Sequence, residues 1–590
     1  MNRIVGFSLA EGLDQESQNS LEKTLDKALQ HFPWLHRLSI RVGRSELIVW
    51  GHGKLSERLH RGKDGVLYVI IGSPIGGINW QEIEENCASK SYKPSWDGRF
   101  ILIKISLQGS HWTMWNDWIG GIPVFHSFIG KGCLACTLET VVVSAGGFTS
   151  KDLFLPGLIS LLVNGHLLGE WTIFKNMKVV RADCCAERKN EGFVWERLNS
   201  VQPSGERWNK GWDELVDEMH ILSREAVASV LKNDVNWVLP LSGGVDSRLI
   251  AGIGCKMGVN FNAYTYGPSN WNEVIFASKV AKALKLKWKR IDFGRDYLAE
   301  HTKMWADWFG SALHFHGMYQ MLFLNALKNE PQGRILHGYM GDPLAGNHAN
   351  GLLTTHSESG LTELLTKSWV HWSAKQVKGL LKFPVGDAIE EVKQEIEKEI
   401  DSVKGAFFQR LMFLDFWNRQ RLFIYYQPAM YDYYRGVETP FLNREYAKFC
   451  MSLPLLALEG RRLQAEMLRK HYYNLAEIPG TYSSEPYILT GKFLLKRKIG
   501  AMLPRFLRIG TFEQFSSIKN TFESDCIKER GKEAIWPIYE KNEYLSEWFN
   551  MDKIDQAYDR ALKGDLQSVI QLTSVQAIAY RLLSAESRER

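Results

Sequence analysis

A short loop at residues 241–247 combines the side chains that bind a phosphate and a metal ion. An apolar run ends at Leu241, and the chain continues as Ser242-Gly243-Gly244-Val245-Asp246-Ser247. Backbone N–H groups gathered at a glycine-rich turn before a helix favour an anion, and glycines let the backbone approach it closely. Serine hydroxyls can donate to phosphate oxygens, and the Asp246 carboxylate is a hard oxygen ligand that suits Mg²⁺. The loop is not a Walker A loop, because the terminal Gly-Lys-Ser/Thr is absent; the alternative interpretation is an ordinary serine- and glycine-rich turn.

The elements around this loop alternate between strands and helices. Residues 237–241 form a predicted strand and residues 249–257 a predicted helix, and a helix is also predicted at 212–231. Further strands are expected at 260–266, 287–292 and 333–337, with a helix at 272–284. Such alternation predicts a doubly wound parallel sheet that binds its ligand at the carboxyl ends of its strands.

The first 200 residues have a different pattern. Gly, Asp and Asn turn signals separate several short apolar runs, at residues 4–9, 46–50, 66–71, 100–107, 112–115 and 133–138. This spacing predicts an antiparallel β-sandwich with few helices.

Composition limits the class of protein and its partners. A chain of 590 residues with 45% hydrophobic and 23% charged residues has the composition of an ordinary soluble globular protein. A net charge of +6 fits an anionic ligand such as ATP and does not argue for nucleic acid. No apolar run reaches the roughly 18 residues of a membrane helix, and the first nine residues are too short for a signal peptide. We therefore expect no transmembrane segment and a cytoplasmic location.

The eight cysteines are scattered along the chain. Cys133 and Cys136 have CxxC spacing, but they lie in a strand-like run and no second pair completes a zinc site. Buried thiols are a better interpretation than a redox site.

The Ser242–Ser247 loop resembles the pyrophosphate loop of ATP pyrophosphatases, which cleave ATP between the α- and β-phosphates. In the first 200 residues, the segments 96–100 (WDGRF) and 116–125 (NDWIGGIPVF) resemble the glutaminase half of asparagine synthetases. The chain thus resembles the asparagine synthetase superfamily over most of residues 1–490. The resemblance implies a degenerate glutaminase-like domain of the N-terminal-nucleophile (Ntn) class at 1–200. It further implies an ATP-pyrophosphatase-type synthetase domain at 208–490, which leaves a helical extension at 491–590.

The same resemblance assigns a second carboxylate to the site. Residues 337–346 (HGYMGDPLAG) are similar to the family's Ser-Gly-Glu-Gly-x-Asp-Glu-x-x-Gly, so Asp342 would pair with Asp246 to hold Mg²⁺ against the phosphates of ATP. Tyr339 and Pro343 stand where the family has glutamates, which implies different chemistry on the acceptor side. The alternative is that Asp342 is a plain loop or helix-capping residue.

Several family features are missing. Asn2 stands where the family's glutaminase has its nucleophilic cysteine, and no Asn-Gly-Glu glutamine-binding loop is found. We therefore expect the first domain to be a structural relic or a surface for a partner protein or peptide. In the family, a lysine in the segment that corresponds to residues 481–486 stabilises the charge that develops in the reaction. Residues 481–486 contain no lysine, and Lys492 and Lys496 are the nearest candidates. The basic stretch 488–508 could bind a membrane surface or an acidic partner, or simply cover the domain as an amphipathic helix.

The sequence as a whole predicts an ATP-dependent amide-forming synthetase that does not hydrolyse glutamine. ATP would adenylate a small-molecule or peptide carboxylate, with release of pyrophosphate, and an amine would then displace AMP. One alternative is an intramolecular cyclase, as in the β-lactam synthetases and lasso-peptide cyclases of this superfamily. Another is a non-catalytic scaffold derived from the enzyme, although Ser242, Asp246, Ser247 and Asp342 all remain.

Overall fold

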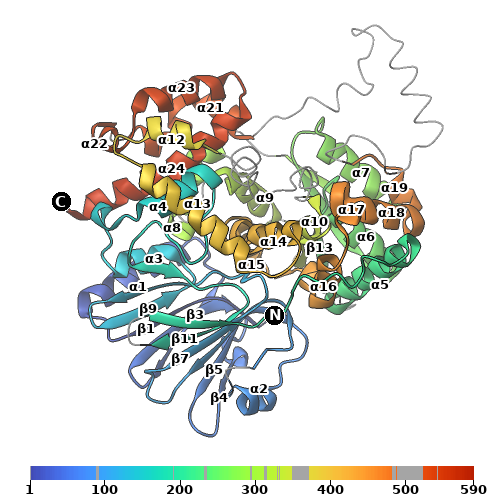
Figure 1. Cartoon of the computed structure of the whole chain (residues 1–590), viewed down its shortest axis with the longest axis horizontal. Coiled ribbons are helices and arrows are strands. Elements are labelled where there is room, and N and C mark those ends of the chain that lie inside the picture. Colours follow the sequence, from blue (N-terminus) through green and yellow to red (C-terminus); the bar gives the residue numbers. More distant parts are fainter. Residues whose placement is uncertain are drawn as a thin grey trace.

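Figure 1 shows a β-sandwich, an α/β domain and a group of helices that covers the sandwich. The computed structural model describes residues 2–589 except 88, 90–91, 190–191, 232–234, 293–295, 311–314, 329, 331–332, 348–370, 481–486, 488–521 and 541. Three features named in the sequence analysis lie outside the described residues. They are the segment 481–486, which lacks the family's lysine, the candidates Lys492 and Lys496, and the basic stretch 488–508.

The first 200 residues form the predicted antiparallel sandwich, built from two six-stranded sheets. Alternate side chains of the two sheets face each other, among them Phe7, Val49, Val69 and Ile103, and form one buried cluster. In spatial order, the first sheet contains β10 (Met177–Val179), β8 (Phe125–Ile129), β9 (Gly132–Cys136), β1 (Arg3–Glu11), β3 (Ser45–His52) and β2 (His36–Val42). The second contains β12 (Gly192–Arg197), β11 (Cys184–Lys189), β7 (Trp112–Asn116), β6 (Asp97–Ile105), β5 (Leu67–Ile75) and β4 (Leu59–Arg61).

Helices cover the outer faces of this sandwich. The sequence analysis did not predict α1, whose Leu21 and Leu25 pack into the same cluster as Val5 and Trp50 of the first sheet. Cys133 and Cys136 are buried in β9, as expected, and burial raises the pKa of both thiols to about 12. The helical elements here are α1 (Gln15–Leu29), η1 (Leu55–Arg58), α2 (Trp80–Asn86), α3 (Glu139–Ala145), η2 (Ser150–Asp152) and α4 (Leu155–Asn164).

The second half contains the predicted parallel sheet. Its five strands are all parallel and lie in the order β15 (Lys287–Ile291), β14 (Phe261–Tyr266), β13 (Trp237–Pro240), β16 (Arg334–Leu336) and β17 (Val437–Glu438). The chain order reverses at β13, so a crevice opens at the carboxyl ends of β13 and β16. The sheet packs with α5 (Trp212–Val230), α6 (Val245–Lys256) and α7 (Asn272–Leu284). Because α6 begins four residues before the predicted helix, Asp246 and Ser247 lie in its first turn.

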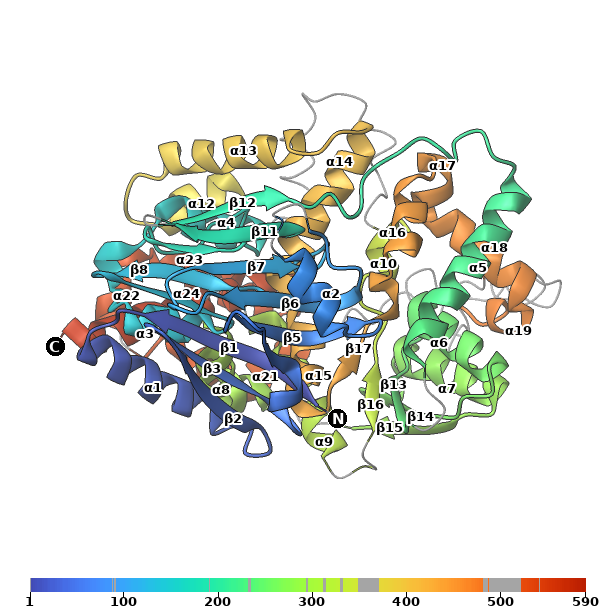
Figure 2. The same ribbon diagram turned by 90° about the horizontal axis from the view of Figure 1, so that it is seen from below.

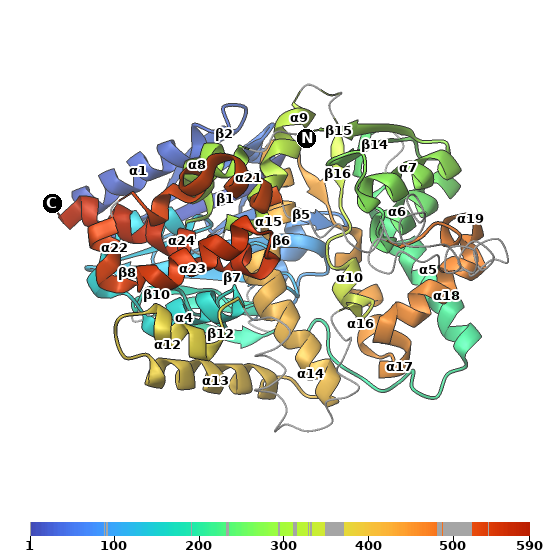
Figure 3. The same ribbon diagram turned by 90° about the horizontal axis from the view of Figure 1, so that it is seen from above.

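The remaining helices divide between the two halves: those at residues 522–589 lie with the sandwich, and those at residues 444–476 lie with the parallel sheet (Figures 2 and 3). Buried side chains of α4, α8 and α24, such as Leu158, Trp305 and Ile578, belong to one hydrophobic cluster. The extension expected to be helical at 491–590 contains, among its described residues, the helices α23 (Met551–Leu562) and α24 (Leu566–Glu589). Among the helices that the structure describes, none combines the length and apolar character needed to cross a lipid bilayer.

Before β17, the helical elements of this part are α8 (Tyr297–Phe309), η3 (Phe315–Tyr319), α9 (Gln320–Leu327), α10 (Gly341–Leu344), α12 (Ala374–Leu380), α13 (Gly386–Asp401), α14 (Phe407–Leu414), η7 (Asp415–Ile424) and α15 (Tyr426–Tyr434). After β17 they are η8 (Pro440–Leu442), α16 (Arg444–Met451), α17 (Leu455–Leu458), η9 (Glu459–Arg461), α18 (Arg462–His471), α19 (Tyr473–Ala476), α21 (Phe522–Arg530), η12 (Gly531–Ile538), α22 (Asn542–Trp548), α23 (Met551–Leu562) and α24 (Leu566–Glu589).

A buried ion cluster ties the first strand of the sandwich to the edge of the parallel sheet. The Arg3 guanidinium lies 2.5 Å from Asp432 Oδ1 and 2.5 Å from Glu438 Oε1. It also donates to the carbonyl oxygen of Val437, at 2.9 Å. All three charged side chains are buried. Arg99 lies 3.6 Å from Asp432 and Arg334 lies 3.6 Å from Glu438, so Arg3 is the closest cation to both carboxylates.

We expect Arg3→Met to lower the free energy of unfolding by about 3 to 5 kcal/mol, because it removes the closest cation from two buried carboxylates and leaves them with Arg99 and Arg334, each 3.6 Å away. Urea unfolding followed by circular dichroism measures this as a lower midpoint. Arg37→Met is the matched control, since Arg37 pairs with Glu22 and Asp26 at the surface and should contribute at most about 1 kcal/mol. Equal midpoints for the two variants would show that the Arg3 cluster does not hold the halves together.

Candidate active site

The loop between β13 and α6 is closed by hydrogen bonds between its own serines. The Ser242 N–H donates to Ser247 Oγ at 3.0 Å, and the two hydroxyl oxygens lie 2.9 Å apart. The Gly244 N–H donates to Ser242 Oγ at 3.1 Å. Neither Gly243 nor Gly244 has a positive φ, so the backbone conformation does not require glycine at these positions. Their contribution is that they leave the surface of the loop without side chains.

Leu241 fixes the loop to the neighbouring strand. This residue is buried, its N–H donates to the Tyr264 carbonyl at 2.8 Å, and its own carbonyl accepts from Thr265 Oγ1 at 2.6 Å. No side chain caps the first turn of α6, which begins directly after Gly244. The first N–H groups of a helix carry a partial positive charge, so this turn is suited to an anion.

A buried cation supports the loop from behind. The Arg248 guanidinium donates to the carbonyl oxygens of Gly243, Leu475, Ile478 and Pro479 at 2.7–2.8 Å. The side chain is fully buried, and burial lowers the pKa of Arg248 to about 10, well above neutral pH. Arg248 therefore fixes the loop against the segment after α19 and adds a positive charge beside it. The sequence analysis did not single out this residue, although it directly follows Ser247.

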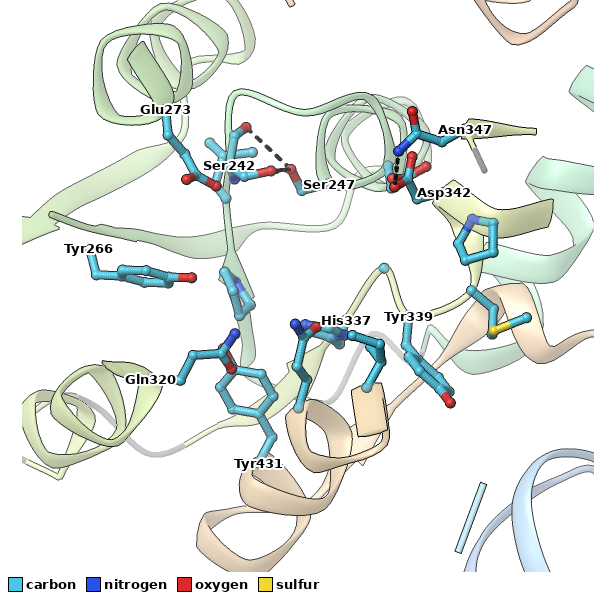
Figure 4. A pocket seen from close by; sticks show the side chains of 18 of the residues that line it. Ser242, Ser247, Tyr266, Glu273, Gln320, His337, Tyr339, Asp342, Asn347 and Tyr431 are labelled. Atoms are coloured by element: carbon cyan, nitrogen blue, oxygen red, sulfur yellow. Dashed lines mark hydrogen bonds between the residues drawn. The ribbon is translucent and has the colours of Figure 1, made fainter. Parts of the chain in front are cut away.

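The loop and the segment after β16 line one cavity of about 410 Å³ (Figure 4). Ser242, Asp246 and Ser247 contribute from the loop side, and Asp342 contributes from α10, which follows β16. The structure thus brings the predicted loop residues and Asp342 together at the crevice between β13 and β16.

Asp246 and Asp342 share one cation, Arg461. The Arg461 guanidinium donates through Nη2 to Asp246 Oδ1 at 2.6 Å, and through Nη1 to Asp342 Oδ1. Asn347 Nδ2 donates to the other oxygen of Asp342 at 2.7 Å. Burial raises the pKa of Asp246 to about 6, with Arg461 lowering it and Asp342 raising it further. For Arg461 burial lowers the pKa, but the two carboxylates raise it overall, so the guanidinium stays charged.

Glycines make this close approach possible. A Cβ atom added at Gly341 would lie 2.8 Å from Asp246 Oδ1 and 2.7 Å from the Phe441 ring. A Cβ at Gly338 would lie 3.1 Å from Asp246 Cβ. The chain after β16 can therefore pass beside α6 only because these two positions lack side chains.

The carboxylate pair fits the ligand preference of Mg²⁺. This ion commonly takes one or two protein carboxylates and completes its shell with phosphate oxygens and water. Among the described residues, no group of three or more His, Cys, Asp or Glu side chains could hold a metal ion. Asp246 and Asp342 are therefore two residues of this cavity that could hold such an ion.

The opposite wall of the cavity is built from aromatic and amide side chains. Tyr339, where the family has a glutamate, is buried, and its hydroxyl donates to the Gln420 carbonyl at 2.8 Å. Gln420 belongs to η7, a ten-residue π-helix, a structure often found at functional sites. Burial lowers the pKa of His337 to about 4, which leaves the ring neutral. Gln320 and Tyr431 also line this wall, whose size and polarity suit an organic substrate.

The segments that resemble a glutaminase play structural roles here. Asn2 does not line this cavity. Its Oδ1 accepts from the Lys54 N–H at 2.8 Å, and its Nδ2 donates to Glu57. The buried Asp117 carboxylate accepts from the N–H groups of Phe100, Ile119 and Gly121, each at 3.1 Å, and burial raises the pKa of Asp117 to about 6.

The Val437–Asn443 segment forms part of the domain interface. Asn443 caps α16 by accepting from the Tyr446 N–H at 2.9 Å. Its Nδ2 also donates to Asp97 Oδ2 of the sandwich at 2.7 Å, so the residue links the two halves.

Comparison with known proteins gives one strong match. The sequence model of the asparagine synthase family matches residues 219–582, more than half of the chain. No curated protein was found to match. Two solved structures are similar over 48% of this chain: the allosteric regulatory enzyme of purine biosynthesis (9% identity, TM-score 0.23) and the glutamine phosphoribosylpyrophosphate amidotransferase of B. subtilis, complexed with ADP and GMP (10% identity, TM-score 0.20). The chain spans 64% and 65% of their respective lengths.

We expect Gly341→Ala to weaken binding of ATP with Mg²⁺ by about tenfold or more, because the new Cβ displaces the Asp246 carboxylate, and one charged hydrogen bond contributes that much. Isothermal titration calorimetry measures the change. Gly379→Ala is the control, since the nearest atom to a Cβ there is 4.0 Å away. Unchanged ATP affinity in Gly341→Ala would show that the position of Asp246 does not depend on a glycine at residue 341.

Proposed function

The chain belongs to the asparagine synthase family, and we propose that it uses ATP to adenylate a carboxylate and then joins the activated acyl group to an amine. The observation that carries this proposal is the meeting of the Ser242–Ser247 loop, Asp246 and Asp342 in one cavity at the carboxyl ends of β13 and β16. A small-molecule or peptide carboxylate and ATP would occupy this cavity together. A cytoplasmic location, where ATP is abundant, is part of the proposal.

The first step would be attack of the substrate carboxylate on the α-phosphorus of ATP, with pyrophosphate as the leaving group. Negative charge then grows on the β-phosphate, next to the loop. The N–H groups at the start of α6 and the Ser242 and Ser247 hydroxyls would donate to it. Arg248, buried behind the loop, adds fixed positive charge at short range. Asp246 and Asp342 would hold Mg²⁺, which supplies neutralisation of the phosphate charge when bound.

In the second step, an amine would attack the acyl carbon and AMP would leave. Holding the acyl-adenylate in a confined cavity places the two reactants close together, which is a large source of rate for such reactions. The neutral His337 ring, Gln320 and Tyr431 would position the acyl group or the amine, because they line the wall opposite the carboxylate pair.

Glutamine is not the proposed source of the amine. The family's glutaminase needs a thiolate, and Asn2 offers a carboxamide that is already hydrogen-bonded to Lys54 and Glu57. The amine would therefore be free ammonia or a group on the substrate itself, and the second is the arrangement of an intramolecular cyclase. The β-sandwich would serve as a structural partner of the synthetase half through Arg3, and its surface remains available for a partner protein or peptide.

We expect Asp246→Asn and Asp342→Asn each to lower ATP–pyrophosphate exchange by roughly 100-fold or more, since each removes a ligand of the cation that stabilises the leaving group. A panel of amino, hydroxy and peptide carboxylates is first screened for exchange with the unaltered protein. Asp97→Asn is the control, because that carboxylate pairs with Arg444 at the domain interface, away from the cavity. Full exchange by either cavity variant would show that the carboxylate pair is not part of the site.

We expect no glutamate to form when the protein is incubated with labelled glutamine, ATP and Mg²⁺, because position 2 lacks a nucleophile. Asn2→Cys alone should not restore hydrolysis, since the glutamine-binding loop is also missing from the sequence. Sustained glutamate release from contaminant-free protein would contradict the proposal and reopen glutamine as the nitrogen donor.

A further inference from the structure

Arg461 enters the cavity from an unusual backbone turn. Gly460 has φ 62° and Arg461 has φ 57°, so two consecutive residues between α17 and α18 are left-handed. This conformation costs little for glycine but carries a steric penalty for a residue with a Cβ atom. Such a conformation persists only where the surrounding contacts fix it. The turn therefore indicates that the contacts of the Arg461 side chain outweigh the strain.

Those contacts use the whole guanidinium. Its two terminal nitrogens bind Asp246 and Asp342, and its Nε donates to Gln464 Oε1 at 2.7 Å. Only 11% of the side chain is exposed. Gln464 in turn donates to Asp246 Oδ1 at 3.4 Å. The arginine is therefore the shared cation of a nearly closed network, and not a mobile surface side chain.

The guanidinium occupies the oxygens that a metal ion would need. Asp342 has one oxygen on Arg461 and the other on Asn347, and Asp246 Oδ1 accepts from both Arg461 and Gln464. A divalent cation cannot approach the same oxygens while a positive guanidinium lies between them. Metal and Arg461 are thus alternative partners of one carboxylate pair.

On the basis of the proposed adenylation function, we propose that Arg461 is a displaceable counter-ion of the nucleotide site. In the nucleotide-free protein it holds Asp246 and Asp342 and prevents a divalent metal from binding there alone. The phosphates of an incoming metal–nucleotide complex draw the guanidinium away, and the metal takes its place on the carboxylates. A guanidinium matches two phosphate oxygens in the way that it matches two carboxylate oxygens, so it exchanges one anionic partner for another.

This exchange couples the binding of metal to the binding of nucleotide. Metal alone must displace Arg461 without offering it a new anion, whereas metal with nucleotide provides the phosphates. By linkage, each ligand then raises the affinity for the other by the same factor. The protein would be protected from loading with metal when no nucleotide is present.

Electron paramagnetic resonance of Mn²⁺ tests the exchange without an activity assay. We expect the unaltered protein to bind Mn²⁺ alone weakly and to bind it about tenfold more tightly or better with α,β-methylene-ATP, a non-cleavable analogue, since a charged hydrogen bond has at least this value. Arg461→Gln should bind Mn²⁺ alone about tenfold more tightly than the unaltered protein. Arg462→Gln is the control, because Arg462 is 53% exposed and pairs with Glu459; its Mn²⁺ affinity should not change.

The two proposals fail in different ways. If the unaltered protein binds Mn²⁺ alone as tightly as it does with the analogue, the counter-ion role of Arg461 is wrong, while the adenylation proposal stands. If the analogue does not bind at all, the proposed function itself is wrong. Should Arg461→Gln fail to fold, the unaltered protein still decides: a thermal midpoint raised as much by Mn²⁺ alone as by Mn²⁺ with the analogue overturns the counter-ion role, and a clearly larger rise with both together supports it.

Discussion

Two carboxylates that must lie side by side in a largely enclosed site are the constraint on which the site depends. Asp246 and Asp342 lie in α6 and α10, the helices that follow the neighbouring strands β13 and β16. Burial and the nearby Asp342 charge both raise the pKa of Asp246. Arg461 compensates for their charge. The pair also explains why Gly338 and Gly341 lack side chains, since a Cβ at either position would press against Asp246. Much of the local architecture follows from bringing these two oxygen ligands to one point.

The β-sandwich contributes to the stability of the fold through a buried ion cluster at its first strand. Strand β1 begins directly after Asn2 and carries Arg3 into contact with Asp432 and Glu438. Removing the sandwich would take Arg3 and Arg99 away from Asp432 and Arg3 away from Glu438, and it would expose the hydrophobic cluster that α4, α8 and α24 share. The synthetase half therefore depends on the sandwich for stability, whatever the sandwich binds at its surface.

The sequence predicted those features that depend on local pattern. Hydrophobic periodicity predicted strand β13 and helix α5, and Ser242-Gly243-Gly244 predicted the loop. The resemblance to the family predicted that Asp342 lies beside Asp246. Arg461 and Arg248 were missed because their partners are distant in the chain: Arg461 reaches back to Asp246, and Arg248 reaches forward to Leu475. Helix α1 was missed because most of its residues are polar, and only Leu21, Leu25 and Ala28 with Ser17 face the core.

The central claim is that ATP is cleaved between its α- and β-phosphates in this cavity. Phosphorus-31 magnetic resonance of ATP turnover by the purified protein, with a carboxylate that supports exchange, tests it most directly. The account predicts that AMP and pyrophosphate appear together in equal amounts. Formation of ADP and orthophosphate instead would contradict it, because the Ser242–Ser247 loop would then not be holding pyrophosphate as the leaving group.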